Sequence, residues 1–192
     1  MAHVYTEDHL VEQPAIQLFA ELGWEVAEPL DETGLFGRET KAEVVLEPRL
    51  RAALEQLNPT LPAEAISIAL DVLTRDRATM SLAAANRNIY ELLKDGVTVS
   101  VPDTGDSTPH PSPLPGRGGE GGGQKTERVR VVDWENPANN DFLLVSQFSV
   151  TGPLYTCRLD LVGFVNGLPF LVVELKRPSP GRTGFSRAST AA

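Results

Sequence analysis

The stretch RLDLVGFVNGLPFLVVELK, residues 158–176, places three charged side chains inside two strongly apolar runs. Asp160 lies in the first run, and Glu174 and Lys176 lie in the second, with an Asn-Gly dipeptide between the runs. An apolar run should exclude charge, because burying an unpaired ion costs several kcal/mol or more. Something must therefore compensate these three side chains, and a bound metal ion is one candidate.

The Asn-Gly dipeptide between two β-branched runs predicts a β-hairpin. Glu174 and Lys176 are two residues apart, so on a strand they share one face. A two-residue loop with regular pairing would put Asp160 opposite Val173, on the face away from Glu174. A common site for the three side chains therefore requires the pairing of the two strands to be shifted by an odd number of residues.

A three-residue loop can supply that shift. With Gly167 in the left-handed conformation and a G1 bulge, Phe164 would pair with Leu168. Asp160 would then lie opposite Val172 and diagonal to Glu174, within reach of one ion. We expect this loop, and the shared site depends on it.

Two carboxylates on adjacent strands, followed by a lysine, form a site suited to a hard divalent cation. Mg²⁺ prefers oxygen ligands, keeps several waters and uses few protein carboxylates. Asp160 and Glu174 would be its side-chain ligands, and the backbone carbonyl of Leu175 is a plausible further one. Lys176 would orient a water nucleophile or stabilise charge on a phosphate. The alternative from charge spacing alone, and the one it favours, is a surface salt-bridge cluster that contributes little.

Composition bounds the remaining possibilities. The chain has 192 residues, suited to one domain, and its single cysteine excludes an internal disulfide and fits a reducing cytoplasm. No apolar run approaches the length of a membrane span, and the N-terminus is too polar for a signal peptide. The net charge of −9 argues against a protein that coats nucleic acid by bulk charge. Any DNA contact would need a local basic patch or a partner that supplies one.

Helical patterns come first along the chain and strand patterns follow. The first helix is expected from Thr6 as N-cap to Gly23, with a kink or break at Pro14, and three further helices are expected within 49–96. Five strands are expected, at 97–101, 127–134, 141–150, 156–165 and 168–176. We therefore expect an α+β fold in which N-terminal helices pack on a mostly antiparallel central sheet.

Two segments have the composition of coil. Residues 104–125 are rich first in proline and then in glycine, which predicts a disordered insertion at a hairpin tip. Residues 179–192 are small and polar and predict a disordered tail. The folded domain is therefore expected to span 1–178.

Longer strings carry a resemblance to a known family. Asp160, thirteen intervening residues and then "ELK" resemble the PD-(D/E)XK nuclease motif. The strings "FVNGLPFLVVELKRP", "NDFLLVSQFSV", "ANRNIYELLKDGV" and "TEDHLVEQPAIQLFAELGW" are similar to the N-terminal nuclease domain of the R subunit of type I restriction endonucleases. The resemblance covers about 1–178, apart from the insertion, and implies a restriction-endonuclease-like fold.

The resemblance implies a Mg²⁺-dependent endonuclease acting on double-stranded DNA, with methyltransferase and specificity subunits as partners. Asp160, Glu174 and Lys176 would be the catalytic residues by motif position. A first-helix glutamate often assists the metal in this fold, and Glu12 is the best match, with Glu7 second. ATP would serve only the DNA-translocating motor of the full-length family, whose motifs are not found in these 192 residues.

Other functions fit the same residues. The chain could be an inactive, truncated remnant of the subunit, acting at most as a DNA-binding or partner-binding module. It could also be a stand-alone PD-(D/E)XK nuclease of DNA repair. The tail does not resemble the continuation of the family, and a frameshift would produce such a tail.

Overall fold

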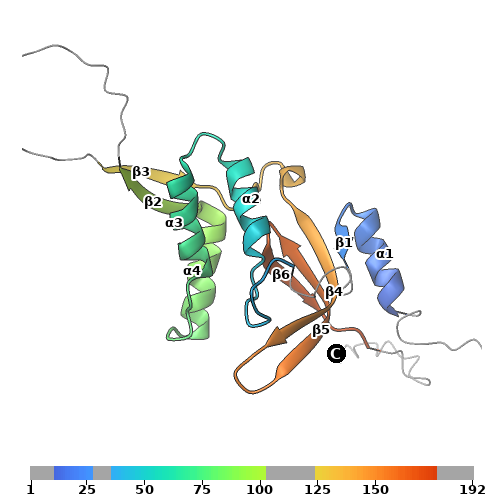
Figure 1. Ribbon diagram of the computed structural model, residues 1–192. Helices are drawn as coiled ribbons and strands as arrows, with labels where there is room; N and C mark the ends of the chain where they lie inside the picture. The colour runs from blue at the N-terminus through green and yellow to red at the C-terminus, as the bar shows by residue number, and fades with distance from the viewer. Residues whose placement is uncertain (1–10, 28–35, 103–123, 177–192) are drawn as a thin grey trace, which may run out of the picture.

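The computed structural model describes residues 11–27, 36–102 and 124–176 (Figure 1). The four α-helices in these ranges are α1 (Gln13–Glu21), α2 (Glu47–Leu57), α3 (Ala63–Thr74) and α4 (Leu82–Asp95). The six strands are β1 (Glu25–Ala27), β2 (Val97–Pro102), β3 (Gln124–Val129), β4 (Phe142–Thr151), β5 (Thr156–Val165) and β6 (Leu168–Val173). A short 3₁₀ turn, Pro137–Asn139, precedes β4.

The strands form two sheets. The central sheet has the order β1-β4-β5-β6, in which β1 runs parallel to β4 and the other neighbours are antiparallel. Strands β2 and β3 form a separate antiparallel ribbon. The predicted α+β class with a mostly antiparallel sheet is confirmed.

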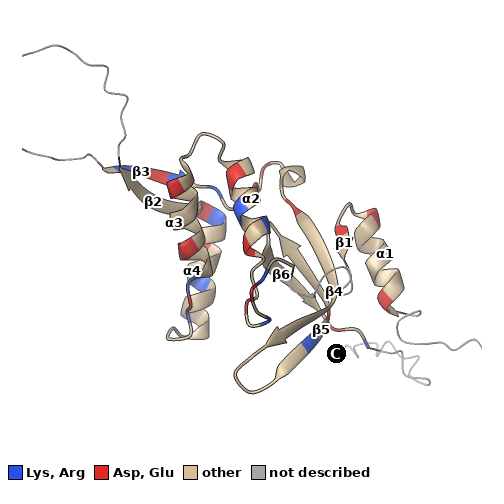
Figure 2. Ribbon diagram, in the orientation of Figure 1, with Lys and Arg blue, Asp and Glu red and all other residues tan. Residues whose placement is uncertain are grey.

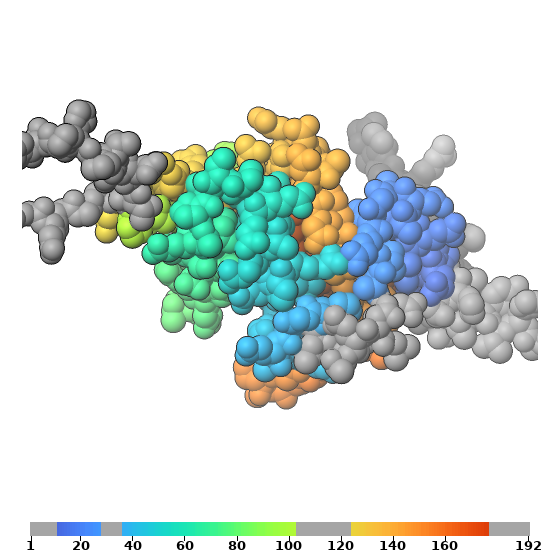
Figure 3. Space-filling view, turned by 45° about the horizontal axis from the view of Figure 1, so that its top comes forward, coloured from blue at the N-terminus to red at the C-terminus, as the bar shows by residue number. Residues whose placement is uncertain are grey.

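Helices α2 and α3 pack together and cover the β2–β3 ribbon (Figures 1 and 3). Their apolar residues recur at helical spacing, so one stripe of each helix faces the core. On β2 the buried and exposed positions alternate strictly, as expected for a strand with one face in the core. The side chains of this cluster include Leu50, Leu54, Ile66, Leu70, Val99 and Val129.

A second apolar cluster lies under one face of the central sheet. It contains Leu46 just before α2, together with side chains of β4 and β5: Leu143, Val145, Phe148, Val162 and Phe164. The rings of Phe148 and Phe164 meet edge to face with centroids 5.1 Å apart. Aromatic pairs in this geometry stabilise beyond the area they bury. This cluster fixes β4 and β5 against each other next to the functional residues.

The β5–β6 turn is held by buried contacts at its tip. Asn166 and Gly167 have φ of 53° and 77°, so the connection is a two-residue loop with both residues left-handed. The Leu46 N–H donates to the Gly167 carbonyl at 2.9 Å, which ties the turn to the start of α2. The Asn166 side chain is fully buried, and its amide donates to the carbonyl of Val131 and to Oδ1 of Asn140.

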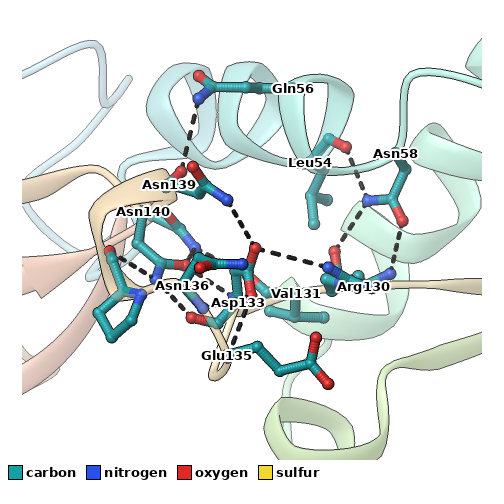
Figure 4. Close-up of polar contacts among 12 residues, drawn as sticks. Leu54, Gln56, Asn58, Arg130, Val131, Asp133, Glu135, Asn136, Asn139 and Asn140 are labelled. Carbon is teal, nitrogen blue, oxygen red and sulfur yellow. Dashed lines mark hydrogen bonds and ion pairs between the residues drawn. The ribbon is translucent and has the colours of Figure 1, made fainter.

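Asp133 organises the loop between β3 and β4, which Figure 4 shows in detail. This carboxylate is only 4% exposed and accepts from the Asn139 amide and from the N–H groups of Asn136 and Glu135. These donors, led by Asn139, hold the pKa of Asp133 below its usual value. Oδ1 of Asn140 accepts from the Asp133 N–H and also from Asn166. The loop and the hairpin turn therefore share one hydrogen-bond network.

Several predicted boundaries were wrong. Gln124 and Lys125, predicted as the end of the insertion, begin β3, and the strand expected at 127–134 ends at Val129. The strand expected at 168–176 ends at Val173. Residues 25–27, where no strand was predicted, form β1. Pro14 lies in the first turn of α1, which directly follows two π-helical residues, 11 and 12, and the missing N–H of Pro14 leaves no hydrogen bond unmade there.

Some predictions fall outside the described residues. These are the helix start at Thr6, the assisting role of Glu7, residues 104–123 of the insertion and the tail at 179–192. Within the ranges that the structure does describe, no helix combines the length and apolarity needed to cross a membrane.

Candidate active site

The register of the β5–β6 hairpin decides whether Asp160 and Glu174 can act together. Near the turn, Val165 pairs with Leu168 and Phe164 with Pro169, so the expected three-residue loop was wrong. The register then shifts, because Gly163 pairs with Leu171 and leaves Phe170 as an extra residue. The odd shift that a common site requires is present, and a bulge inside β6 supplies it.

Beyond the bulge, Leu161 pairs with Val173. One residue further along come Asp160, still in β5, and Glu174, the first residue after β6, so extending this register would place the two opposite each other. With the regular pairing of a two-residue loop alone, Asp160 would have been level with Val173. Residues opposite each other in an antiparallel pair lie on the same face, close enough for their side chains to interact.

The Asp160 carboxylate is fixed by the backbone of the chain that follows β6. Its Oδ2 accepts a hydrogen bond of 2.7 Å from the Leu175 N–H. Asp160 is half-buried, whereas Glu174 and Lys176 are exposed. The hydrogen bond orients the carboxylate and leaves its other oxygen for a further partner.

The salt-bridge reading of these residues finds no support in the described part of the chain. Among residues 11–27, 36–102 and 124–176, no ion pair involves Asp160, Glu174 or Lys176. Like charges directly opposite each other on neighbouring strands are destabilising. If the register continues to Asp160 and Glu174, the two carboxylates would be like charges on neighbouring chain segments, an arrangement that a cation would relieve.

Glu12 approaches the sheet from the start of α1. Its Oε1 accepts a hydrogen bond of 2.9 Å from the Gln147 side chain on β4. Figure 2 shows acidic positions at both ends of α1. The described ranges contain no group of three His, Cys, Asp or Glu side chains spaced to hold a metal. Glu12 is thus linked to the site through Gln147 and is not gathered with the other two carboxylates.

The donors at the hairpin fit Mg²⁺. The extended register would place two carboxylates opposite each other, and the backbone at Leu175 borders one of them. Mg²⁺ is usually bound through one or two carboxylates and retains waters at its remaining positions, so a larger cage of side chains is not required. The ionic chemistry of this donor set is that of a hard divalent cation.

Comparisons with known proteins place the chain in a family. The family model described as "Type I restriction enzyme R protein N terminus" matches residues 4–112 and 117–191. The matched region continues past the predicted domain boundary at 178 and leaves out only 113–116 of the predicted insertion. The chain therefore belongs to the family of type I restriction enzyme R protein N-terminal domains.

Two curated relatives carry concordant names. The type I restriction enzyme HindI endonuclease subunit of Haemophilus influenzae is 35% identical over 172 residues, 88% of this chain and 15% of the relative. The putative type I restriction enzyme MjaIXP endonuclease subunit of Methanocaldococcus jannaschii is 29% identical over 92% of this chain and 16% of the relative. The chain thus spans about one sixth of the length of these relatives. No solved structure matches it.

The sequence prediction of the site omitted Gln147. This residue faces Asp160 across the β4–β5 pair, between the partners Ser146–Leu161 and Phe148–Leu159. The order Gln147, Asp160, Glu174 therefore crosses three adjacent strands. The string "SQFSV" contains no glycine or turn residue that would mark Gln147 as special, so only the backbone geometry reveals it.

Proposed function

We propose that this chain is the Mg²⁺-dependent endonuclease domain of a type I restriction R subunit and hydrolyses phosphodiester bonds in duplex DNA. Family membership and the names of the relatives support a nuclease role. The observation that carries the proposal is the register shift inside β6, which if continued by one residue brings Asp160 and Glu174 opposite each other. We propose Asp160, Glu174 and Lys176 as the PD-(D/E)XK residues from their motif spacing, and this register supports the assignment.

Each residue has a distinct role in this proposal. Asp160 and Glu174 bind Mg²⁺, and the backbone carbonyl of Leu175 offers a third oxygen. The Leu175 N–H orients the Asp160 carboxylate before the cation arrives. Bound Mg²⁺ supplies Lewis acidity toward the phosphate and lowers the pKa of a coordinated water. The positive charge of Lys176 orients the nucleophile or stabilises the negative charge that develops on the phosphate in the transition state.

DNA binding in the proposal depends on local charge and on partners. The chain carries a net charge of −9, so its average field repels DNA. Arg158 lies two residues before Asp160 on β5, and Lys176 follows Glu174, so cations flank the carboxylates. The methyltransferase and specificity subunits of a type I complex would supply the remaining contacts and the base recognition. Mg²⁺ is the one cofactor proposed for this chain, and ATP is left to the motor of longer family members.

Cleavage of supercoiled plasmid by the purified chain tests the proposal. With Mg²⁺ present we expect nicked and linear products, and with EDTA we expect none. Asp160→Ala and Lys176→Ala should each reduce cleavage by at least about 100-fold, because each removes a group that acts on the reacting phosphate. Glu55→Gln, an exposed carboxylate on α2, is the matched control and should cleave like the unmodified chain.

Different results would point to the other readings. A folded chain that leaves the plasmid intact at all Mg²⁺ concentrations would favour an inactive binding module. Cleavage that survives Asp160→Ala would locate the chemistry elsewhere or reveal a contaminant. Either result would contradict the proposed site.

A further inference from the structure

Gln147 has a backbone conformation that its position does not predict. It lies in the middle of β4 with a φ of 53°, in the left-handed region that non-glycine residues rarely adopt. The residues on both sides keep regular partners on β5, Ser146 with Leu161 and Phe148 with Leu159. Strained residues of this kind cluster at functional sites, where the surrounding structure holds them in place.

The left-handed residue changes which side chains face the core. Val145 and Phe148 both pack into the apolar cluster under the sheet, although they are three residues apart and a regular strand alternates every two. Their partners on β5, Val162 and Leu159, pack against the same cluster. The alternation of core-facing and outward-facing side chains is therefore interrupted at Gln147 on β4 and at Asp160 on β5.

Because of this interruption, the Gln147 side chain lies outside the apolar cluster and points toward the start of α1. Its Nε2 donates to Glu12 Oε1 at 2.9 Å, across 135 positions of sequence. Because an amide is neutral, it fixes the direction of the Glu12 carboxylate without cancelling its charge. A lysine or arginine at this position would form an ion pair with Glu12 and would compete with a cation for it.

One hydrogen bond and the strand registers order four residues across the sheet. Glu12 just before α1 is hydrogen-bonded to Gln147 on β4, Gln147 lies between two β4 residues whose partners flank Asp160 on β5, and Glu174 follows β6 where an extended register would meet Asp160. Because Mg²⁺ keeps several waters in proteins, a carboxylate that is not a direct ligand can still accept a hydrogen bond from one of them. Mutation of residues that contact the ligands of a metal, rather than the metal itself, typically changes metal affinity 10–100-fold.

We propose that Gln147 is a positioning residue that holds the Glu12 carboxylate toward the cation bound by Asp160 and Glu174. The inference rests on the proposed function, because it takes the Asp160–Glu174 pair as the cation site. It adds a residue and a contact that the nuclease motif does not contain. It also gives the strained backbone at Gln147 a physical reason.

Binding of Mn²⁺ to the full 192-residue chain, measured as free Mn²⁺ by electron paramagnetic resonance, tests the inference without requiring cleavage. Gln147→Gly should weaken affinity about tenfold. It should not lower the melting temperature, because glycine adopts the left-handed conformation freely. A residue with a merely structural role would show the opposite pattern, with lower stability and unchanged affinity.

A double-variant comparison separates direct coupling from independent effects. If Gln147 acts through Glu12, then Glu12→Gln combined with Gln147→Gly should bind Mn²⁺ no more weakly than Glu12→Gln alone. The matched control is Gln17→Ala, which breaks an analogous Gln–Glu hydrogen bond of 3.1 Å on the exposed face of α1. This control should bind Mn²⁺ like the unmodified chain.

The outcomes distinguish failure of the inference from failure of the proposed function. Binding that Asp160→Asn abolishes but Gln147→Gly leaves unchanged would overturn the inference alone. Additive losses in the double variant would also overturn it, because the two residues would then act separately. No Mn²⁺ binding by the unmodified chain, or binding insensitive to Asp160→Asn, would overturn both.

Discussion

The carbonyl of Gly167 accepts a hydrogen bond from the N–H of Leu46 at 2.9 Å, so the tip of the β5–β6 hairpin is attached to the start of α2. The hairpin that carries Asp160 and Glu174 is therefore anchored at the end opposite to its functional residues. This attachment positions the register shift in β6 relative to the helices. The predictions below test the anchor, the network beside it and the site itself.

Substitution of Gly167 should destabilise the fold strongly. A Cβ at this position would lie 2.6 Å from both the Leu46 carbonyl oxygen and the Leu50 nitrogen, which are backbone atoms that cannot move aside. The residue also has a φ of 77°. We expect Gly167→Ala to lower the free energy of unfolding by about 2 kcal/mol or more, measured by urea denaturation. In the control Gly152→Ala, the nearest atom would be 3.6 Å away, and the change should be small. Equal effects of the two substitutions would contradict the anchor.

Asp133 should make stability depend on pH at the acid end. Its folded-state pKa is depressed, chiefly by the hydrogen bond from Asn139, so its contribution is present above the unfolded pKa of roughly 4. That contribution is lost as pH falls through the lower folded-state value. Asp133→Asn should therefore lower the urea midpoint at pH 7, and the difference from the unmodified chain should shrink toward pH 2–3. A difference that stays constant or widens on acidification would count against this account of the network.

Removal of one carboxylate should stabilise the fold when no metal is present. Glu174 is exposed and would lie opposite Asp160 in the extended register, so Glu174→Gln relieves repulsion worth roughly 0.2–1 kcal/mol. The melting temperature of this variant should rise less than that of the unmodified chain when Mg²⁺ is added, because the stabilisation by a bound ligand grows with the logarithm of its affinity. Thermal unfolding with EDTA and with Mg²⁺ measures both effects. If Glu174→Gln is neutral under both conditions, the two carboxylates do not share a charge environment.

Much of the fold follows from sequence periodicity. Strand β5 has its predicted bounds, 156–165, because β-branched and apolar residues predominate up to the Asn-Gly turn. Helix α4 lies within the predicted helical region 49–96 and begins after Ser81, whose side chain caps it by accepting from the Ala84 N–H. Strand β1 was missed because three residues carry no periodic signal and its partner, β4, is more than a hundred residues away.

The sequence proposes the residues of the candidate site but not their geometry. The charges in the apolar runs single out Asp160, Glu174 and Lys176 as candidates. Because side chains alternate between the two faces of a strand, these three can share one face only if the strand pairing is shifted by an odd number of residues. The sequence does not say where the shift occurs, because a bulge at Phe170 and a longer loop at Gly167 have the same effect on parity. The left-handed Gln147 was unpredictable for a related reason, since tertiary packing rather than local preference holds it.

The central claim is that Asp160 and Glu174 bind one divalent cation, and anomalous diffraction from crystals containing Mn²⁺ tests it most directly. The account predicts a single strong peak with oxygen atoms of both carboxylates at roughly 2.1–2.2 Å, and loss of that peak in Asp160→Asn crystals. Full occupancy of Mn²⁺ elsewhere, or carboxylates that turn away from each other with no peak between them, would contradict it.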